Sequence, residues 1–198
     1  MAVKARHRLL ATARDLFYAE GIRAVGLERL LAESGVGRAS FYRHFGSKDD
    51  LVAAMLDDYD SEYRTWLRER VAELGNEPLA VFDAVAERAE STHFRGCAFI
   101  NTMAEIADPA DPVHARAAAH KSAVTDYIAE LLSRHAGAER AKSMASTWML
   151  LLDGAVVVAS YQQVLHPFAE AKSIAAAGLT DLRTPKSGSS GNGVQVRA

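Results

Sequence analysis

Cysteine is almost absent from this chain: Cys97 is the only one among 198 residues, so no internal disulfide can hold the fold. Long apolar runs are absent too. The best candidate for a membrane span, 148–159, contains Asp153 and is shorter than the ~18 uncharged residues that a membrane helix needs. No apolar signal core follows the basic N-terminus. We therefore expect a cytoplasmic protein with no membrane partner.

Motifs that carry catalysis or bind cofactors are also lacking. The sequence has no glycine-rich phosphate loop, no His-Glu-x-x-His, no Cys-x-x-Cys and no Gly-x-Ser-x-Gly. His93 and Cys97 are four residues apart, but no third metal ligand accompanies them. His114 and His120 are expected to be surface or hydrogen-bonded helix residues. We predict neither an enzyme nor a metal site, and no cofactor.

Strand patterns are missing as well, because no run alternates cleanly between apolar and polar residues and alanine is abundant. We therefore predict an all-α fold. Helices are expected at about 5–20, 27–34, 38–44, 48–74, 77–92, 97–107, 113–135, 138–165 and 167–178. The Gly/Ser-rich end of the chain cannot bury a core. The expected parts are a head at 1–47, a helical body at 48–180 and a disordered tail at 181–198.

The charge of the chain is unevenly distributed. Residues 1–48 carry nine Lys or Arg and four Asp or Glu, a balance of +5, whereas the remainder carries −7. A basic head on an acidic body suits a protein that meets a polyanion at one end only. This asymmetry by itself favours a nucleic-acid partner only slightly, because charge fluctuates along any chain.

The pattern within the head is more specific. After a first helix with one apolar stripe, Gly21 is suited to end it. A second short helix then runs into Ser34-Gly-Val-Gly37, a tight turn in which Val36 is the apolar plug. The next helix is too short to be stable alone, so Phe41 and Phe45 must anchor it on the other two.

The other side of that third helix is predicted to face DNA. Arginine can donate two hydrogen bonds to guanine, serine, tyrosine and histidine suit phosphate oxygens, and a small Ala39 allows close approach. A merely solvated face would not explain why a phenol lies among the charges. The exposed residues are Arg38, Ala39, Ser40, Tyr42, Arg43 and His44.

Residues 9–51 resemble the headpiece of the tetracycline-repressor (TetR) family, above all in Phe41-Tyr-Arg-His-Phe-Gly-Ser-Lys48. The resemblance implies that the third helix enters the major groove. It implies backbone contacts from Tyr42, His44 and Lys48, and base contacts from the positions of Arg38, Ala39, Ser40 and Arg43. Gly26 and Gly37 depart from the family's hydroxyl caps. The fourth helix would link the head to a ligand-binding, dimer-forming body.

The resemblance also implies an effector pocket between the body helices, and its apolar lining favours a small lipophilic or aromatic compound. Ordinary core packing is the commoner role of each aromatic residue. The candidate lining is Tyr59, Tyr63, Trp66, Phe82, Phe94, Cys97, Phe99, Met103, Tyr127 and Trp148. The family's last two helices form a dimer interface, here assigned to Leu151, Gly154, Ala155, Val158, Ala159 and Gln162.

The expected function is therefore a transcriptional regulator, by family habit a repressor. It would bind a palindromic operator as a homodimer and be released by its effector. Two alternatives stay open. Cys97 could be a redox- or electrophile-sensing thiol, because a nearby Arg or His favours the thiolate. The body could also be a helical small-molecule-binding protein whose head reads DNA only weakly.

Overall fold

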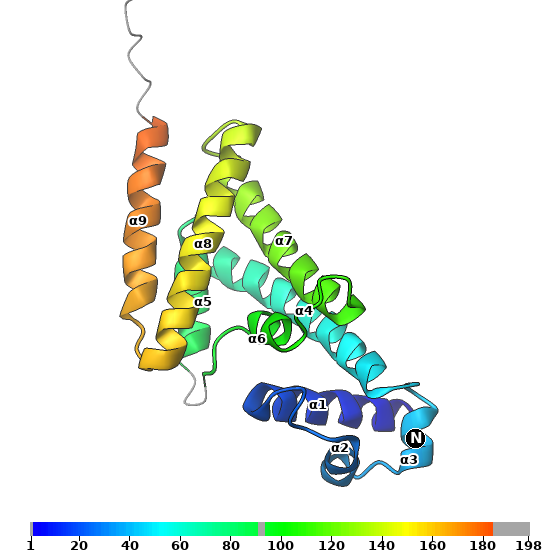
Figure 1. Ribbon diagram of the computed structural model, residues 1–198. Helices are drawn as coiled ribbons and strands as arrows, with labels where there is room; N and C mark the ends of the chain where they lie inside the picture. Colours follow the sequence, from blue (N-terminus) through cyan, green and yellow to red (C-terminus); the bar gives the residue numbers. More distant parts are fainter. Residues whose placement is uncertain (1, 91–93, 184–198) are drawn as a thin grey trace, which may run out of the picture.

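The computed structural model describes residues 2–90 and 94–183, and within these ranges every regular element is a helix. The all-α prediction is confirmed. Figure 1 shows a small head of three helices and a body in which α4 and α7 run side by side toward α8 and α9. The helices are α1 Ala2–Glu20, α2 Leu27–Ser34, α3 Arg38–Tyr42, α4 Lys48–Glu73, α5 Ala80–Ala89, α6 Ala98–Glu105, α7 Pro112–Leu132, α8 Ala138–Gln162 and α9 His166–Arg183.

The head is built as the sequence predicts. Gly35 ends α2 in the left-handed conformation (φ 60°), which a side chain would disfavour. Val36 in the following turn is buried, and so are Phe41 and Phe45 of the third helix region. Gly26 and Gly37 provide no side-chain cap to α2 and α3. The short α3 therefore depends on its two phenylalanines for its position.

Helix α4 joins the head to the body without a break. The hydroxyl of Ser47 accepts a hydrogen bond from the amide of Asp50 (3.0 Å) and caps the helix. Leu51, Val52 and Leu56 of its first half lie in the hydrophobic core of the head, whereas Leu67 lies in the core of the body. A movement of α4 therefore displaces the head as well.

The body core lies where α5, α7, α8 and α9 meet. Phe82 and Trp148 pack there with ring centroids 5.5 Å apart. Small residues allow α8 and α9 to approach closely, and Ala155 and Ala159 of α8 share this core with Ala171 of α9. This packing accounts for the apolar residues on the buried side of α8.

Several helix ends differ from their predicted positions. Pro78 lies in a turn, where the carbonyl oxygens of Glu77 and Pro78 accept hydrogen bonds from the amides of Ala80 and Val81, so α5 begins at Ala80 instead of 77. Helix α8 stops at Gln162 because Gln163 adopts a left-handed conformation. Helix α9 continues to Arg183, so the predicted tail is wrong for residues 181–183. The rest of that tail, 184–198, lies outside the described residues.

Helix α8 also meets the length and hydropathy of a membrane span, with a mean hydropathy of 1.4 over its most apolar window. Two observations explain this composition without a membrane. The buried side of α8 belongs to the body core, and Asp153 in its middle forms an ion pair with Lys121 of α7.

Candidate functional site

The candidate DNA-binding face is the outer side of α3. Arg38, Ala39 and Arg43 are exposed, and Tyr42 keeps 51% of its surface exposed with its ring edge against buried Phe41. Ser40, His44 and Lys48 are half-buried. The structure thus brings the predicted DNA-binding residues together on α3 and at the start of α4. Their contacts with DNA stay a prediction.

Two cations near this face have partners within the protein. Arg38 pairs with Glu28 of α2. Lys48 donates a hydrogen bond to the carbonyl oxygen of Ile22, with its Nζ atom 5.5 Å from the centre of the Phe17 ring. Arg43 has no ion pair among the described residues. Arg43 is therefore the arginine most available to a base, and Lys48 also holds the head together.

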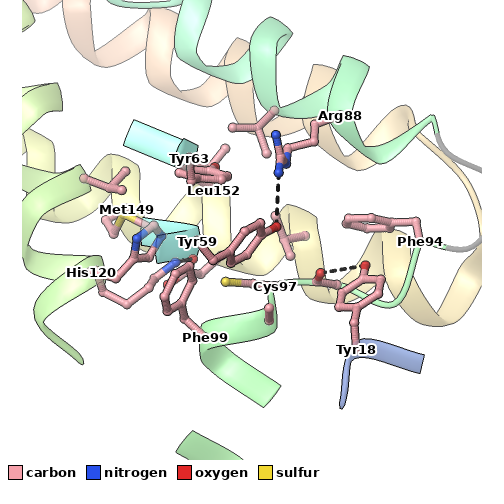
Figure 2. A pocket seen from close by; sticks show the side chains of 17 residues that line it. Tyr18, Tyr59, Tyr63, Arg88, Phe94, Cys97, Phe99, His120, Met149 and Leu152 are labelled. Carbon is pink, nitrogen blue, oxygen red and sulfur yellow. Dashed lines mark hydrogen bonds and ion pairs between the residues drawn. The ribbon is translucent and has the colours of Figure 1, made fainter. Parts of the chain in front are cut away.

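The candidate effector site is a cavity of about 310 Å³ lined by residues of α4, α5, α7, α8 and the start of α6, with Tyr18 of α1 at one end. This volume is at the lower end of ordinary ligand pockets. Figure 2 shows the ring of Tyr59, the sulfur of Cys97 and the guanidinium of Arg88 around it. Tyr59, Phe99 and His120 form one stack, with centroids 5.5 Å and 3.6 Å apart.

Half of the residues predicted for the pocket line this cavity. They are Tyr59, Tyr63, Phe94, Cys97 and Phe99. The other five do not line it, which corrects their expected placement. Phe82 and Trp148 pack on each other in the body core, and Met103 packs against the head core. The guanidinium carbon of Arg68 lies 4.2 Å from the centre of the Tyr127 ring, and that of Arg88 lies 4.5 Å from the centre of the Trp66 ring.

The polar residues of the cavity escaped the sequence analysis. Arg88, His120, Lys121 and Asp153 all line it, together with Tyr18. A usable signal was present for Asp153, which is the one charged residue of the apolar segment 148–159 of α8. Arg88 does not stand out in this way, because α5 also carries Asp83 and Glu87. The aromatic stripe alone could not identify them.

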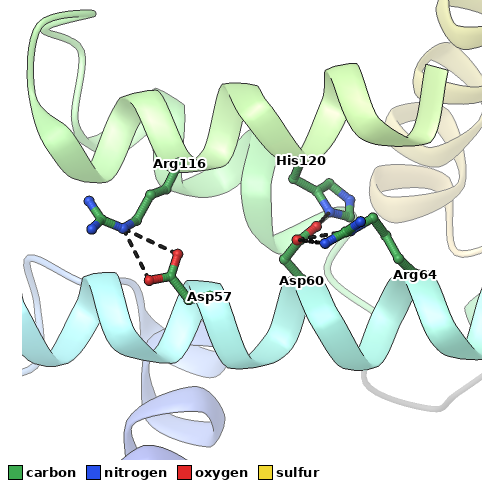
Figure 3. Close-up of polar contacts among 5 residues, drawn as sticks. All are labelled: Asp57, Asp60, Arg64, Arg116 and His120. Atoms are coloured by element: carbon green, nitrogen blue, oxygen red, sulfur yellow. Dashed lines mark hydrogen bonds and ion pairs between the residues drawn. The ribbon is translucent and has the colours of Figure 1, made fainter. Parts of the chain in front are cut away.

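His120 is the most deeply buried of these polar groups, with 3% of its surface exposed. Its Nδ1 lies 2.7 Å from a carboxylate oxygen of Asp60 on α4 (Figure 3), and the same carboxylate accepts a hydrogen bond from Arg64 (2.9 Å). Burial lowers the pKa of His120 to about 4, and the hydrogen bond to Asp60 only partly opposes this. Burial also acts on Asp60, but hydrogen bonds from Arg64 and His120 together hold its pKa below the usual value. His120 is thus neutral at pH 7.

This burial predicts an acid-sensitive fold. Between about pH 6.5 and pH 4 the unfolded chain binds a proton at His120 that the folded protein does not, so stability falls as the pH falls. We expect a loss of about 2 kcal/mol from this residue between pH 7 and pH 5. Urea unfolding at both pH values measures it, with His120→Leu as the comparison. A His120→Leu variant with an undiminished pH difference would contradict this origin.

Helix α6 connects the cavity to the head. Cys97 and Phe99 at its start line the cavity, while Glu105 at its end accepts hydrogen bonds from the amides of Ile22 and Arg23 (3.0 and 2.8 Å) in the turn after α1. Gly21 has φ 95°, and a Cβ there would lie 3.0 Å from the same carboxylate. Glycine therefore lets the carboxylate approach the turn.

A second link joins α1 to the segment before α6. The hydroxyl of Tyr18 donates to the carbonyl oxygen of Gly96 (3.1 Å) and accepts from the amide of Arg95 (2.8 Å), as Figure 2 shows for the former. The guanidinium of Arg95 donates to the carbonyl oxygen of Tyr18 (3.1 Å). Both ends of α6 are thus held against the end of α1.

An apolar stripe on α8 faces away from the core. It consists of Leu150, Gly154, Val157 and Tyr161, spaced by four, three and four residues, and Leu150 and Tyr161 are 76% and 67% exposed. Of the residues assigned to a dimer interface, Gly154 and Gln162 are exposed, and Leu151 and Val158 are half-buried.

The remaining two interface assignments are corrected. Ala155 and Ala159 are buried within the single chain, where they let α9 pack against α8. The exposed stripe of α8 runs through positions 150, 154, 157 and 161, each one residue before the predicted positions 151, 155, 158 and 162. Because α8 carries apolar residues on both sides, its sequence does not indicate which side is buried.

The suggested metal pair gains no support. His93 lies outside the described residues, and residues 2–90 and 94–183 contain no group of three His, Cys, Asp or Glu side chains that could hold a metal ion. His114 is hydrogen-bonded to the carbonyl oxygen of Ile106 (2.6 Å), and His120 to Asp60 through Nδ1, so the prediction of hydrogen-bonded helix residues is confirmed for both.

Comparison with known proteins supports both parts of the chain. Residues 9–55 match the family described as bacterial regulatory proteins, tetR family, and residues 79–174 match the transcriptional regulator LmrA/YxaF-like C-terminal domain. The crystal structure of SCO4454, a TetR-family transcriptional regulator from Streptomyces coelicolor, is 35% identical. It superposes with a TM-score of 0.82 over 92% of this chain and 97% of that one.

Curated relatives match over shorter stretches. The transcriptional repressor NemR of Escherichia coli K12 is 38% identical over 64 residues, 32% of each chain. The regulator TtgR of Pseudomonas putida is 27% identical over 118 residues, 53% of this chain and 56% of its own length. The chain thus spans less than two thirds of these curated relatives. With the headpiece, the helical body and the SCO4454 likeness in agreement, the chain belongs to the TetR family of transcriptional regulators, which are DNA-binding proteins and not enzymes.

Proposed function

We propose that this regulator is a cytoplasmic repressor that binds a palindromic operator as a homodimer and releases it when a small apolar or aromatic compound enters the cavity of Figure 2. The observation that carries the proposal is the path from that cavity to the head. The cavity wall includes Tyr18 of α1, and α6 joins the cavity to the turn after α1 through Glu105.

The contacts of α1 suggest how occupancy weakens DNA binding. A compound that displaces Cys97 or Phe99 shifts α6, and Glu105 transmits the shift to the amides of Ile22 and Arg23. A compound that pushes against Tyr59 moves α4, whose first half packs in the head. Two heads must reach major-groove faces ~34–36 Å apart, so small displacements of each head weaken binding.

Selection of the purified protein against a random duplex DNA pool tests the first half of the proposal. Recovery of an inverted repeat with fixed half-site spacing supports a sequence-reading dimer. Recovery of no motif at low salt favours the open alternative, a small-molecule-binding body with weak DNA readout. The recovered site then serves as the operator probe in every experiment below.

The link through Glu105 gives a specific prediction. We expect Glu105→Gln to keep operator affinity within about threefold but to reduce effector-induced release by roughly 5-fold or more, since the coupling free energy between two sites of a protein is typically only ~1–3 kcal/mol. The amide offers one acceptor oxygen in place of the carboxylate's two, so one of the two head contacts is lost. Operator titration by fluorescence anisotropy with and without effector measures the coupling.

The control for this experiment is Glu73→Gln, which alters a carboxylate at the far end of α4 whose one ion-pair partner among the described residues is Arg70. Full effector response in Glu105→Gln would show that the signal does not pass through the end of α6. Loss of operator binding itself would instead identify Glu105 as a structural support of the head.

Sensing by Cys97 is a second candidate, favoured by the position of this thiol in the cavity wall. The guanidinium of Arg95, a residue expected to favour the thiolate, donates instead to the carbonyl oxygen of Tyr18. Cys97→Ser separates the two mechanisms. If the serine variant still releases operator DNA on treatment with oxidants or electrophiles, thiol sensing is excluded.

A further inference from the structure

Among the described residues, no carboxylate pairs with Arg88, a cation at the wall of the effector cavity. Its Nη2 donates one hydrogen bond to the hydroxyl of Tyr59 (3.2 Å), and its guanidinium lies 4.5–5.6 Å from the ring centres of Trp66, Tyr63 and Tyr59. A guanidinium offers five N–H donors in a planar fork that matches a carboxylate. Most of this capacity is unused by the described residues.

The acidic groups around Arg88 do not neutralise it. Asp153, the carboxylate on the cavity wall, pairs with Lys121. Arg88 also borders a second hollow of about 720 Å³ between head and body, whose acidic residues are Asp15, Glu62 and Glu105. Glu62 pairs with Arg14 (2.7 Å), Glu105 binds the head, and no carboxylate of the described residues lies within 4.0 Å of the Arg88 nitrogens. The cavity therefore carries one uncompensated positive charge.

Beyond Arg88, the cavity is mainly apolar. Its lining includes Val85, Val124, Met149, Leu152 and Val156. His120 supplies a second polar point. Its Nδ1 is hydrogen-bonded to Asp60, whereas Nε2 has no hydrogen-bond partner among the described residues. Every fully buried side-chain nitrogen or oxygen of these residues has such a partner, so Nε2 is not fully buried. Because His120 lines the cavity, we take Nε2 to be accessible from it. In the neutral ring that donates through Nδ1, Nε2 is a hydrogen-bond acceptor.

From this arrangement we infer that the effector is an organic acid, whose carboxylate binds the free N–H groups of Arg88 and whose aromatic or aliphatic body fills the apolar part of the cavity. This inference rests on the proposed function, which it sharpens from any lipophilic compound to a monoanionic amphiphile. A hydroxyl on the body, placed to donate to Nε2 of His120, would add to its affinity.

The same geometry disfavours a cationic effector. Tyr59 and Tyr63 are the cavity-wall rings on which a ligand cation would lie, and the Arg88 guanidinium already lies over both. An ammonium group would also be repelled by Arg88 in a partly desolvated site. A carboxylate, in contrast, forms charge-assisted hydrogen bonds that are roughly twice as strong as neutral ones.

Three probes of nearly the same shape test the inference with the full chain: 4-phenylbutanoate, neutral 4-phenylbutanamide and cationic 4-phenylbutylamine. Titration calorimetry is expected to show that the carboxylate binds at least about tenfold more tightly than either of the others. Arg88→Met should remove this preference, and Arg88→Lys, which keeps the charge, should retain part of it. Arg68→Met is the matched control, because Arg68 also stacks on an aromatic ring (Tyr127, 4.2 Å) but lies outside the cavity.

The outcomes separate this inference from the proposed function. A carboxylate that binds no more tightly than the amide or the amine overturns the inference, and so does a preference that survives Arg88→Met in a variant with normal thermal unfolding. If the amide or the amine releases the operator, the proposed function stands and the acid assignment fails. If 4-phenylbutanoate binds through Arg88 but leaves operator affinity unchanged, the anion site is supported and its role as the effector site is overturned.

Discussion

Val157→Arg is expected to convert the proposed dimer to a monomer and to weaken operator binding by about 100-fold or more. Val157 lies in the middle of the exposed stripe on α8, between Gly154 and Tyr161, and is 45% exposed in the single chain. A self-complementary interface between two copies brings the same stripe of each copy together. An arginine there would place two like charges into an apolar contact. Loss of the second head removes the avidity of two linked sites, which is typically 10²–10⁴-fold.

Sedimentation equilibrium of the full chain and anisotropy titration of the selected operator measure the two effects. Thr65→Arg is the control, because it adds the same charge at an exposed position of α4 outside the stripe. A Val157→Arg protein that stays dimeric with unchanged operator affinity would show that the copies associate through another surface. A monomer that binds as tightly as the wild type would show that one head suffices.

The head could be predicted from sequence because short-range rules determine it. The glycine that ends α2, the buried Val36 and the spacing of Phe41 and Phe45 each depend on neighbouring residues only. The all-α body follows from composition in the same way. Its helix ends were less predictable at Pro78, where a turn precedes α5, and at Gly178, which does not end α9.

The cavity depends on contacts between distant segments, which no local pattern reveals. Tyr59, Tyr63 and Phe99 line it, but an aromatic stripe cannot distinguish Tyr59 from Trp148, which is buried in the core. Glu105 bonds to a turn 82 and 83 residues earlier in the chain, and nothing near Glu105 indicates this. On α8, apolar residues on both sides concealed which side is buried.

Arg43→Ala is expected to lower affinity for the selected operator by roughly 30-fold to 10⁴-fold, because each of two heads loses a base contact that contributes ~1–3 kcal/mol. Arg43 is exposed on α3 and lacks the ion pair that engages Arg38, so its fork is free for guanine. Operators with substitutions at each half-site position, titrated over a salt series, identify the base it reads. Arg43→Lys should keep the salt dependence but lose the base preference, because lysine lacks the bidentate fork. If Arg43→Ala instead weakens all sequences equally and lowers the salt slope by ~0.9 for each head, Arg43 contacts phosphate, and the base-reading role passes to other residues of α3.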